Sequence, residues 1–382
     1  MFRTLLILTL IPGTLMPASL VPRFRHQIIA TGLKGGYQVA AADVNGDGKP
    51  DLVALASGMP ELVWFENPSW ERRLLAGGQT RMINLAAWDS DGDRIPEIVL
   101  ASAFSNEAAN SPGIVSVLRR QGDPRQPWEV WEIDRLPTSH RIRVADIDGS
   151  GRKVFVNAPL TGPAAKGPDY RGRTPLVYYR PGEWKRHLIG DENEGVVHGF
   201  TVFDWDGDGR DEILTASFSG IHLYDYSGGK WTRSELTRGD PSPWPKSGAS
   251  EIAVGHLGPR RFLCSIEPWH GHQVVIYRES QGAWRRQVLD DSFADGHTVH
   301  AADLNGDGRD EIIAGYRGRG YRAYIYTADD GEGERWTRHL LDDEVAVASC
   351  AVAGLTGSGR PDIACIGSST ANLKLYVNEG GR

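Results

Sequence analysis

Short apolar runs separated by acidic, glycine-rich turns recur along the whole chain. The stretch 200–217, FTVFDWDGDGRDEILTAS, has one apolar run on each side of the turn DWDGDG. Further copies, some of them divergent, begin at residues 40, 85, 142, 300 and 350. The repeat is about 40 to 55 residues long, a period typical of architectures that stack one supersecondary unit many times.

Each copy predicts four antiparallel strands. The two apolar runs beside the turn are followed by a third strand such as LVWFEN or IHLYDY, and then by a W-x-R-x-L strand such as WERRLL or WTRHLL. No long 3.6-residue period appears after the N-terminus, so the chain is predicted to be all-β. Four antiparallel strands per repeat are typical of the blade of a β-propeller.

Seven blades are predicted, and the last one is completed by the start of the chain. The fifth repeat lacks the acidic turn, and the seventh lacks its fourth strand. The segment RFRHQIIATG from Arg23 matches the fourth strands of the other repeats. We therefore expect an N-terminal strand to close the ring, which removes exposed sheet edges. The predicted domain is a seven-bladed β-propeller over 23–382, with blades at 37–75, 80–133, 138–189, 197–236, 249–289, 297–341 and 348–378.

Residues 1–20, MFRTLLILTLIPGTLMPASL, are predicted to be a secretory signal peptide. Arg3 precedes an apolar stretch from residue 5 to residue 16, and small residues follow it. The apolar stretch is too short to span a membrane. A buried N-terminal strand is the alternative, and Pro12 and Gly13 oppose it. We therefore expect a secreted or periplasmic protein.

Composition argues against two classes of partner and does not decide whether the cysteines form a disulfide. The net charge is −7 and no basic stripe is present, so neither nucleic acid nor a membrane surface is supported as a partner. The 3 cysteines are too few for a disulfide framework. Cys350 and Cys365 fall on neighbouring strands, so a disulfide between them is the alternative, but three buried thiols are the favoured interpretation. We expect a monomer.

The acidic turns have the spacing of a calcium loop. In the turn that begins at Asp204, carboxylates occupy positions 1, 3, 5 and 9, which can surround one Ca²⁺ much as in an EF-hand. Asp and Asn also hydrogen-bond to their own turn backbone, so such a loop can close without an ion. We expect structural Ca²⁺ in at least one loop, with these candidate ligands: Asp43, Asn45, Asp47, Asp51, Asp204, Asp206, Asp208, Glu212, Asp303, Asn305, Asp307 and Glu311.

Polar residues recur at equivalent positions before the turns. The position six residues before each turn holds Tyr37, Ile83, His140, His198, Ser250, His297 and Ala348. The next position holds Gln38, Asn84, Arg141, Gly199, Glu251, Thr298 and Ser349, with His300 slightly deeper. In a propeller these positions surround one mouth of the central channel, where a pocket is expected.

Loops between the second and third strands add basic and aromatic residues to the same rim. Blade three contributes Lys166, Tyr170 and Arg171, blade five contributes Trp269 and His270, and blade six contributes Arg317. A single loop histidine is more often a hydrogen-bonding residue than a catalyst, and Trp269 either stacks on a sugar or packs within the blade. Together the basic groups suit an anionic or carbonyl-bearing ligand.

The turns resemble the FG-GAP or VCBS repeats of integrin α-subunits and of many exported bacterial proteins. Longer stretches, among them VVHGFTVFDWDGDG and DGHTVHAADLNGDGRDEIIAGYRG, are similar to the propeller of aldos-2-ulose dehydratases, which dehydrate keto-sugars. They are also similar to propeller lyases that cleave rhamnose–glucuronate linkages by elimination. The resemblance implies an exported, carbohydrate-active carbon–oxygen lyase that acts on a uronate- or keto-sugar.

Both resembled chemistries share one step. A base removes the proton next to a carbonyl or carboxylate, the enolate is stabilised, and a β-oxygen leaves. We predict His198 or Tyr170 as the base and Arg171 and Arg317 as the groups that hold the enolate or carboxylate. His140 and His297 are predicted to protonate the leaving oxygen or to bind a catalytic divalent metal. Further candidates for binding the carbohydrate are Trp269, His270, His300, Glu251, Tyr37 and Lys166.

A non-catalytic propeller that binds carbohydrate or protein, as in integrins, is the alternative. Such a binder would present aromatic and amide groups at its mouth rather than clustered titratable groups. Hydrolysis would require two facing carboxylates, and only Glu251 and Glu267 are available, both in one blade. The histidines therefore favour a lyase.

Overall fold

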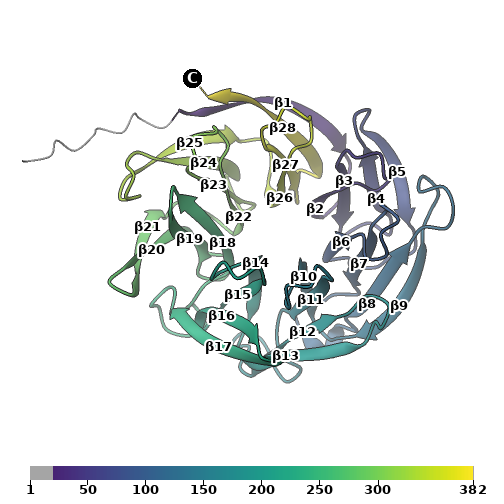
Figure 1. Ribbon diagram of the computed structural model, residues 1–382, viewed down its shortest axis with the longest axis horizontal. Coiled ribbons are helices and arrows are strands. Elements are labelled where there is room, and N and C mark those ends of the chain that lie inside the picture. The colour runs from purple at the N-terminus through teal and green to yellow at the C-terminus, as the bar shows by residue number, and fades with distance from the viewer. Residues whose placement is uncertain (1–19, 382) are drawn as a thin grey trace, which may run out of the picture.

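Each repeat folds into one four-stranded antiparallel sheet, and seven such sheets surround a central channel (Figure 1). The computed structural model describes residues 20–381, so residues 1–19 of the expected signal peptide lie outside the described chain. Within that range the only helical segment is the 3-10 turn η1 (Ala108–Asn110). No helix in the described chain is both long enough and apolar enough to cross a membrane. The all-β, seven-bladed prediction is confirmed.

The strands of a blade follow one another outward from the channel. The innermost strands are β2 (Gly36–Ala42), β6 (Asn84–Trp88), β10 (Ser139–Ala145), β14 (Val197–Phe203), β18 (Glu251–Leu257), β22 (Gly296–Ala302) and β26 (Val347–Ala353). The second strands are β3 (Asp51–Ala56), β7 (Glu97–Ser102), β11 (Val154–Pro159), β15 (Glu212–Ser217), β19 (Arg260–Glu267), β23 (Glu311–Tyr316) and β27 (Asp362–Gly367).

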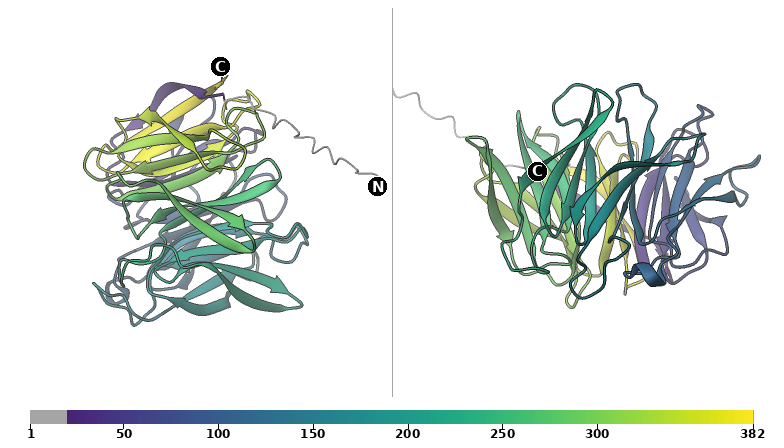
Figure 2. Two further views of the ribbon diagram at one scale, coloured as in Figure 1. Left: turned by 90° about the vertical axis from the view of Figure 1, so that its left-hand side faces the viewer. Right: turned by 90° about the horizontal axis from the view of Figure 1, so that it is seen from below.

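The two outer positions of each blade complete the sheet. The third strands are β4 (Leu62–Glu66), β8 (Ile114–Arg119), β12 (Arg173–Tyr179), β16 (Gly220–Ser227), β20 (Gln273–Ser280), β24 (Arg322–Ala328) and β28 (Asn372–Gly381). The outermost strands are β5 (Glu71–Ala76), β9 (Glu129–Arg135), β13 (Arg186–Glu194), β17 (Lys230–Thr237), β21 (Ala283–Asp290), β25 (Trp336–Asp342) and β1 (Pro22–Thr31). Figure 2 shows the strands running along the channel axis, with the loops gathered at its two rims.

The hydrophobic core lies between neighbouring blades. Second strands such as β3 and β15 are buried at every position, whereas the outermost strand β17 is mostly exposed or half-buried. One core cluster combines Leu55 and Trp64 of the first blade with Leu85 and Ile98 of the second. Because each apolar layer is shared by two blades, every blade depends on both of its neighbours for burial.

The start of the chain completes the last blade, as predicted. β1 pairs with β28 in antiparallel register from Pro22 opposite Gly381 to Thr31 opposite Asn372, and Figure 1 shows the purple and yellow strands side by side. Phe24 packs on the core between the sixth and seventh blades. Ile29 packs on the core between the seventh and first blades. The closing strand therefore contributes to two interblade cores.

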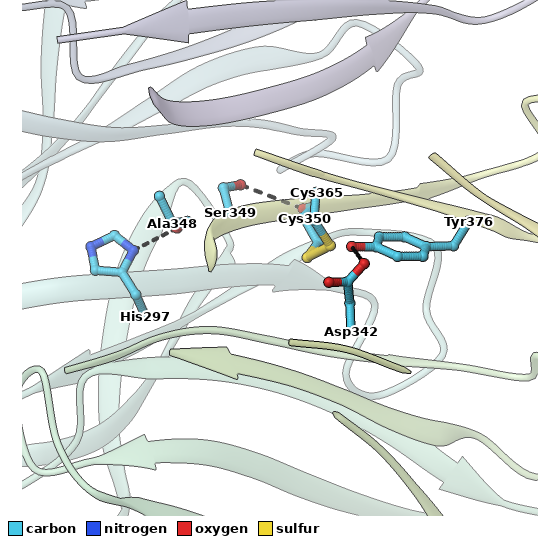
Figure 3. Close-up of a disulfide and its surroundings, with 7 residues drawn as sticks. All are labelled: His297, Asp342, Ala348, Ser349, Cys350, Cys365 and Tyr376. Carbon is cyan, nitrogen blue, oxygen red and sulfur yellow. Dashed lines mark hydrogen bonds between the residues drawn. A yellow bond between two sulfur atoms is a disulfide. The ribbon is translucent and has the colours of Figure 1, made fainter. Parts of the chain in front are cut away.

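One cysteine expectation is wrong. Cys350 and Cys365 form a disulfide (Figure 3), where three buried thiols were favoured from the sequence. The two residues lie directly opposite each other on β26 and β27, and opposed residues of antiparallel strands bring their Cβ atoms within about 5 Å. Cys264 remains a free, buried thiol, and burial raises its pKa.

Candidate functional site

Five of the innermost strands contain a bulge near their start. In β10 the register moves from Ser139 opposite Pro159 to Arg141 opposite Ala158, so His140 has no partner on β11. The same shift occurs in β2, β14, β22 and β26. A bulge re-aims its side chain away from the regular pleat. The residues left unpaired in this way are Tyr37, His140, His198, His297 and Ala348.

Four histidines meet at this mouth of the channel, and we call them the histidine cluster. They are His140, His198, His270 and His297. His270 comes from the loop between β19 and β20, and the other three come from bulged positions. The ring centre of His198 lies 4.9 Å from that of His140, 4.8 Å from that of His270 and 5.0 Å from that of His297. The structure thus brings four predicted site residues into contact.

Oxygen atoms lie behind Nδ1 of three of these rings. His297 Nδ1 lies 2.6 Å from the carbonyl oxygen of Ala348 (Figure 3). This oxygen only accepts, so His297 Nδ1 carries the ring proton and its Nε2 is a bare lone pair. His198 Nδ1 lies 3.0 Å from Glu251 Oε1 and 3.1 Å from the Ser250 hydroxyl, which can donate or accept, and His270 Nδ1 lies 3.3 Å from Asp295 Oδ1, which accepts no hydrogen bond among residues 20–381.

The Nε2 atoms of these rings face one another. His198 Nε2 and His270 Nε2 are 3.1 Å apart, and His297 Nε2 is buried with no hydrogen-bond partner among residues 20–381. One ring nitrogen from each of the three lies within 4.8 Å of the others. Burial lowers the pKa of all three rings, and nearby Arg141 and Arg317 lower it further, so protonation does not relieve the contact.

A divalent metal ion fits these three nitrogens. If Nδ1 of both His198 and His270 carries the proton, their Nε2 lone pairs converge at 3.1 Å, and a cation between them removes the repulsion. Three imidazoles form a common ligand set for Zn²⁺ and related first-row ions, with further positions left for water or substrate. Metal-ligating histidines usually donate the other ring N–H to a carboxylate or a backbone carbonyl. His297 has this arrangement, and carboxylate oxygens lie 3.0 and 3.3 Å from Nδ1 of His198 and His270.

A second network joins Tyr37 and Arg141 to His140 of the histidine cluster. Arg141 Nη2 donates to Glu251 Oε1 over 2.7 Å, and its Nη1 lies 3.3 Å from the Tyr37 hydroxyl and 3.1 Å from His140 Nε2. The guanidinium only donates, so Tyr37 can accept from Arg141 and donate to His140 Nε2 over 3.0 Å. Burial opposes the charge of Arg141, yet Tyr37 and Glu251 raise its pKa above the usual value.

Arg317 stands beside the same mouth. Its Nε donates to Asp295 Oδ2 over 2.9 Å, and its guanidinium carbon lies 5.9 Å from the centre of the Tyr37 ring. Its terminal amino groups have no side-chain partner within the described residues and are left for a ligand. Two arginines and two carboxylates balance in charge at the cluster, so a bound divalent metal would make the site attractive to an anion.

Other predicted residues lie farther out. Tyr170 is connected to the histidine cluster only through Trp269. The ring centre of Trp269 lies 5.5 Å from that of Tyr170 and 4.9 Å from that of His270. Arg171 pairs with Glu194 across 3.3 Å on the surface and lies over the ring of Trp244, which belongs to the loop between blades four and five.

Arg141, rather than Arg171, is the arginine that contacts the histidines. Lys166 is exposed on the same outer loop, and His300 lies one layer deeper in the channel. Asp295 was missed, because the loop before β22 has no counterpart in the repeated motif. Its position two residues before His297 was the only available signal.

The acidic turns close through their own backbone at the opposite rim. Asp204 Oδ1 accepts from the amides of Gly207 and Asp208 over 2.9 and 3.1 Å, and Glu212 accepts from the amide of Trp205 over 2.6 Å. Equivalent bonds occur in the turns that begin at Asp43 and Asp303. Oxygens of Asp204, Asp206 and Glu212 nevertheless lie within 4.8 Å of one another, as a cation site requires.

Calcium at these turns remains a prediction. After divalent ions are removed, the protein is expected to melt at a lower temperature, and added Ca²⁺ should restore the melting temperature whereas Zn²⁺ should not. Asp204→Ala should reproduce part of the loss. Thermal unfolding followed by circular dichroism measures both effects. Equal melting temperatures with and without Ca²⁺ would leave the hydrogen-bonded turn as the whole explanation.

Comparisons with known proteins agree with this architecture. Residues 112–280 match the family "Aldos-2-ulose dehydratase, beta-propeller domain", and residues 43–100 and 303–365 match "FG-GAP-like repeat". The aldos-2-ulose dehydratase of Phanerodontia chrysosporium is 25% identical over 349 residues. That alignment covers 79% of this chain and 38% of the relative, so the chain spans well under half of that protein.

A solved structure shares the fold. A chain in the crystal structure of BBS1N in complex with ARL6DN, soaked with mercury, matches with a TM-score of 0.56 at 12% identity. The match covers 94% of this chain and 96% of the other, and at this identity it shows the fold alone. The chain is thus a seven-bladed β-propeller with FG-GAP-like repeats, and it resembles the propeller domain of a carbohydrate-related protein, aldos-2-ulose dehydratase.

Proposed function

We propose that this protein is a carbon–oxygen lyase that acts on a keto-sugar or uronate at the histidine cluster. The observation that carries the proposal is the convergence of three imidazole nitrogens beside a tyrosine held by a buried arginine. The name of the relative, a dehydratase of an aldos-2-ulose, supports a reaction in which a sugar loses a β-oxygen. A purely binding propeller would have no need of this arrangement.

The metal and Arg317 supply the electrophilic part of the site. When bound by His198, His270 and His297, a divalent metal would act as a Lewis acid toward a substrate carbonyl or carboxylate oxygen. Glu251, Asp295 and the Ala348 carbonyl fix the orientation of the three rings. The free amino groups of Arg317 suit a second substrate oxygen, because a planar guanidinium can pair with two oxygens at once.

Tyr37 is the base in this proposal. Its oxygen lies against the fixed positive charge of Arg141, and its proton has an acceptor in His140 Nε2 at 3.0 Å. Removal of the substrate α-proton by Tyr37 breaks the C–H bond as the Tyr37 proton moves to His140. Burial lowers the pKa of His140, so the charged ring readily returns a proton to the leaving β-oxygen as C=C forms and C–O breaks.

This assignment changes the roles predicted from sequence. His198 was a candidate base, but its Nε2 faces His270 and its Nδ1 faces Glu251, which suits a metal ligand. Tyr170 lies behind Trp269. Trp269 itself is half-buried beside His270, where its ring face suits stacking on a sugar.

The product tests the proposal directly. Elimination creates C=C conjugated to a carbonyl or carboxylate, so the zinc-loaded protein is expected to raise ultraviolet absorbance with at least one keto-sugar or uronate of a substrate panel. Tyr37→Phe should lower turnover by about 100-fold or more. Arg238→Ala is the matched surface control, since its side chain is 87% exposed on the outer rim of blade four. Binding of a sugar with no chemical change in any panel member would favour the non-catalytic alternative.

A further inference from the structure

The central channel contains a cavity of about 290 Å³ beneath the histidine cluster. The innermost strands of all seven blades line it. Three residues before each turn, most blades contribute a small side chain to this layer, such as Ala40, Ala86 and Ala253. Blade three contributes Arg143 and blade six contributes His300. Neither residue belongs to the proposed catalytic network.

Arg143 has only neutral partners. Its Nη1 donates to Asn84 Oδ1 over 3.2 Å and to the carbonyl oxygen of Ile142 over 2.8 Å. Its Nε and Nη2 have no partner in the part of the chain that the structure describes, and its guanidinium lies over the Phe200 ring at 5.8 Å. Burial and the neighbouring Arg141 lower the pKa of Arg143 to about 10, so it stays charged at neutral pH.

The carboxylate near Arg143 is already engaged. Glu251 pairs with Arg141 at 2.7 Å and with His198 at 3.0 Å. Gly199 leaves room for this carboxylate, because a Cβ there would lie 2.6 Å from Glu251 Oε2. Burial and Arg143 lower the pKa of His300 to about 4, so it adds no charge at neutral pH. Arg141 and Arg143 therefore face a single carboxylate, that of Glu251, across the cavity.

The remaining polar lining groups are neutral, and several are donors. The side-chain amide of Gln38 is hydrogen-bonded to the backbone of Leu85. Its Nε2 donates to the Leu85 carbonyl oxygen over 3.0 Å, and its Oε1 accepts from the Leu85 amide over 2.7 Å. Thr201 and Thr298 line the same space, as does Ser349, whose hydroxyl donates to the carbonyl oxygen of Cys350 over 3.5 Å. Arg143 is half-buried, and a partly desolvated charge without a counter-ion is costly. A divalent metal in the histidine cluster would add to the positive potential.

We propose that the channel binds a small monovalent anion, of the size of a halide or formate, next to the Arg143 guanidinium. Arg143 Nη2 and Nε supply charged donors, and the hydroxyls of Thr201 and Thr298 supply neutral ones. The cavity is large enough for such an ion with several waters. The bound anion offsets the charge that Arg143 places beneath the histidine cluster. This site is separate from the proposed lyase activity and does not depend on a sugar.

Bromide tests the site in crystals. Crystals of metal-free protein soaked in sodium bromide are expected to show an anomalous peak within hydrogen-bonding distance of the Arg143 guanidinium. His297→Ala, which removes a predicted metal ligand, should keep this peak, so failure of the lyase proposal and failure of this one are distinguishable. A channel without bromide density at Arg143 would overturn the proposal.

Thermal unfolding tests the site in solution. At constant ionic strength, exchange of the bulky anion gluconate for chloride, bromide or formate is expected to raise the melting temperature in a saturable way. Arg143→Met should weaken the apparent affinity at least tenfold, whereas Arg143→Lys should retain part of it. The proposal would be contradicted if the melting temperature of Arg143→Met rose and saturated at the same anion concentrations as that of the parent protein. If Arg143→Met does not fold, the proposal is tested by the anion affinity of Arg143→Lys and by the bromide peak in crystals of the parent protein.

Discussion

Replacing His297 with alanine is expected to abolish stoichiometric metal binding and to lower lyase turnover by at least about 100-fold. His297 Nε2 is buried and has no partner among residues 20–381, and its Nδ1 proton is held by the Ala348 carbonyl at 2.6 Å. Removing the ring leaves two nitrogens where the structure offers three. Elemental analysis of the zinc-loaded protein and the ultraviolet product assay measure the two effects.

A contrasting variant separates metal binding from proton transfer. In His140→Asn the three nitrogens toward the metal are unchanged, because His140 Nε2 faces Tyr37 and Arg141 instead. This variant should keep its zinc and still lose about 100-fold or more in turnover. Arg238→Ala should behave like the parent protein in both assays. Full zinc content in His297→Ala, or lost zinc in His140→Asn, would contradict the assigned roles.

The bulged positions were predictable because they repeat. Alignment of the repeats with one another selected Tyr37, His140, His198 and His297 at the position six residues before the turn. The structure places all four at one mouth of the channel. Residues outside the repeat were harder to place. Arg171 belongs to an inserted loop, whose path depends on Trp244 and Glu194 rather than on the blade register.

The protonation pattern of the cluster could not be predicted from sequence. It depends on which acceptor each ring meets, and Glu251 reaches His198 from the neighbouring blade. The side-chain contact across the blade boundary is set by blade packing and by the space at Gly199. The repeat pattern places residues on strands, but it does not specify such distances between blades.

The disulfide shows the same limit on a smaller scale. The sequence placed Cys350 and Cys365 on neighbouring strands, but only the register of β26 and β27 puts them directly opposite each other. A one-residue slip would have turned one side chain to the other face. A disulfide is typical of proteins from oxidising compartments, and export of this chain stays a prediction.

Deleting residues 22–31 is expected to cause the largest loss of stability. β1 forms nine Cα-partner pairs with β28, and its removal exposes the edge of a strand that is buried from Leu373 to Asn378. At about 1 kcal/mol per lost backbone hydrogen bond and roughly 2 °C per kcal/mol for a large domain, the melting temperature should fall by about 10 °C or more. Differential scanning calorimetry measures this change.

The loss should reach beyond one sheet edge, because β1 also covers two interblade cores. Phe24 packs between the sixth and seventh blades, and Ile29 packs between the seventh and first. The truncated protein should therefore aggregate through β28, since an open edge pairs with other chains. A synthetic peptide of residues 22–31 should restore much of the lost stability, whereas a scrambled peptide should not. A truncated protein that stays monomeric and melts within about 2 °C of the parent, roughly a 1 kcal/mol change, would show that the ring does not depend on this strand.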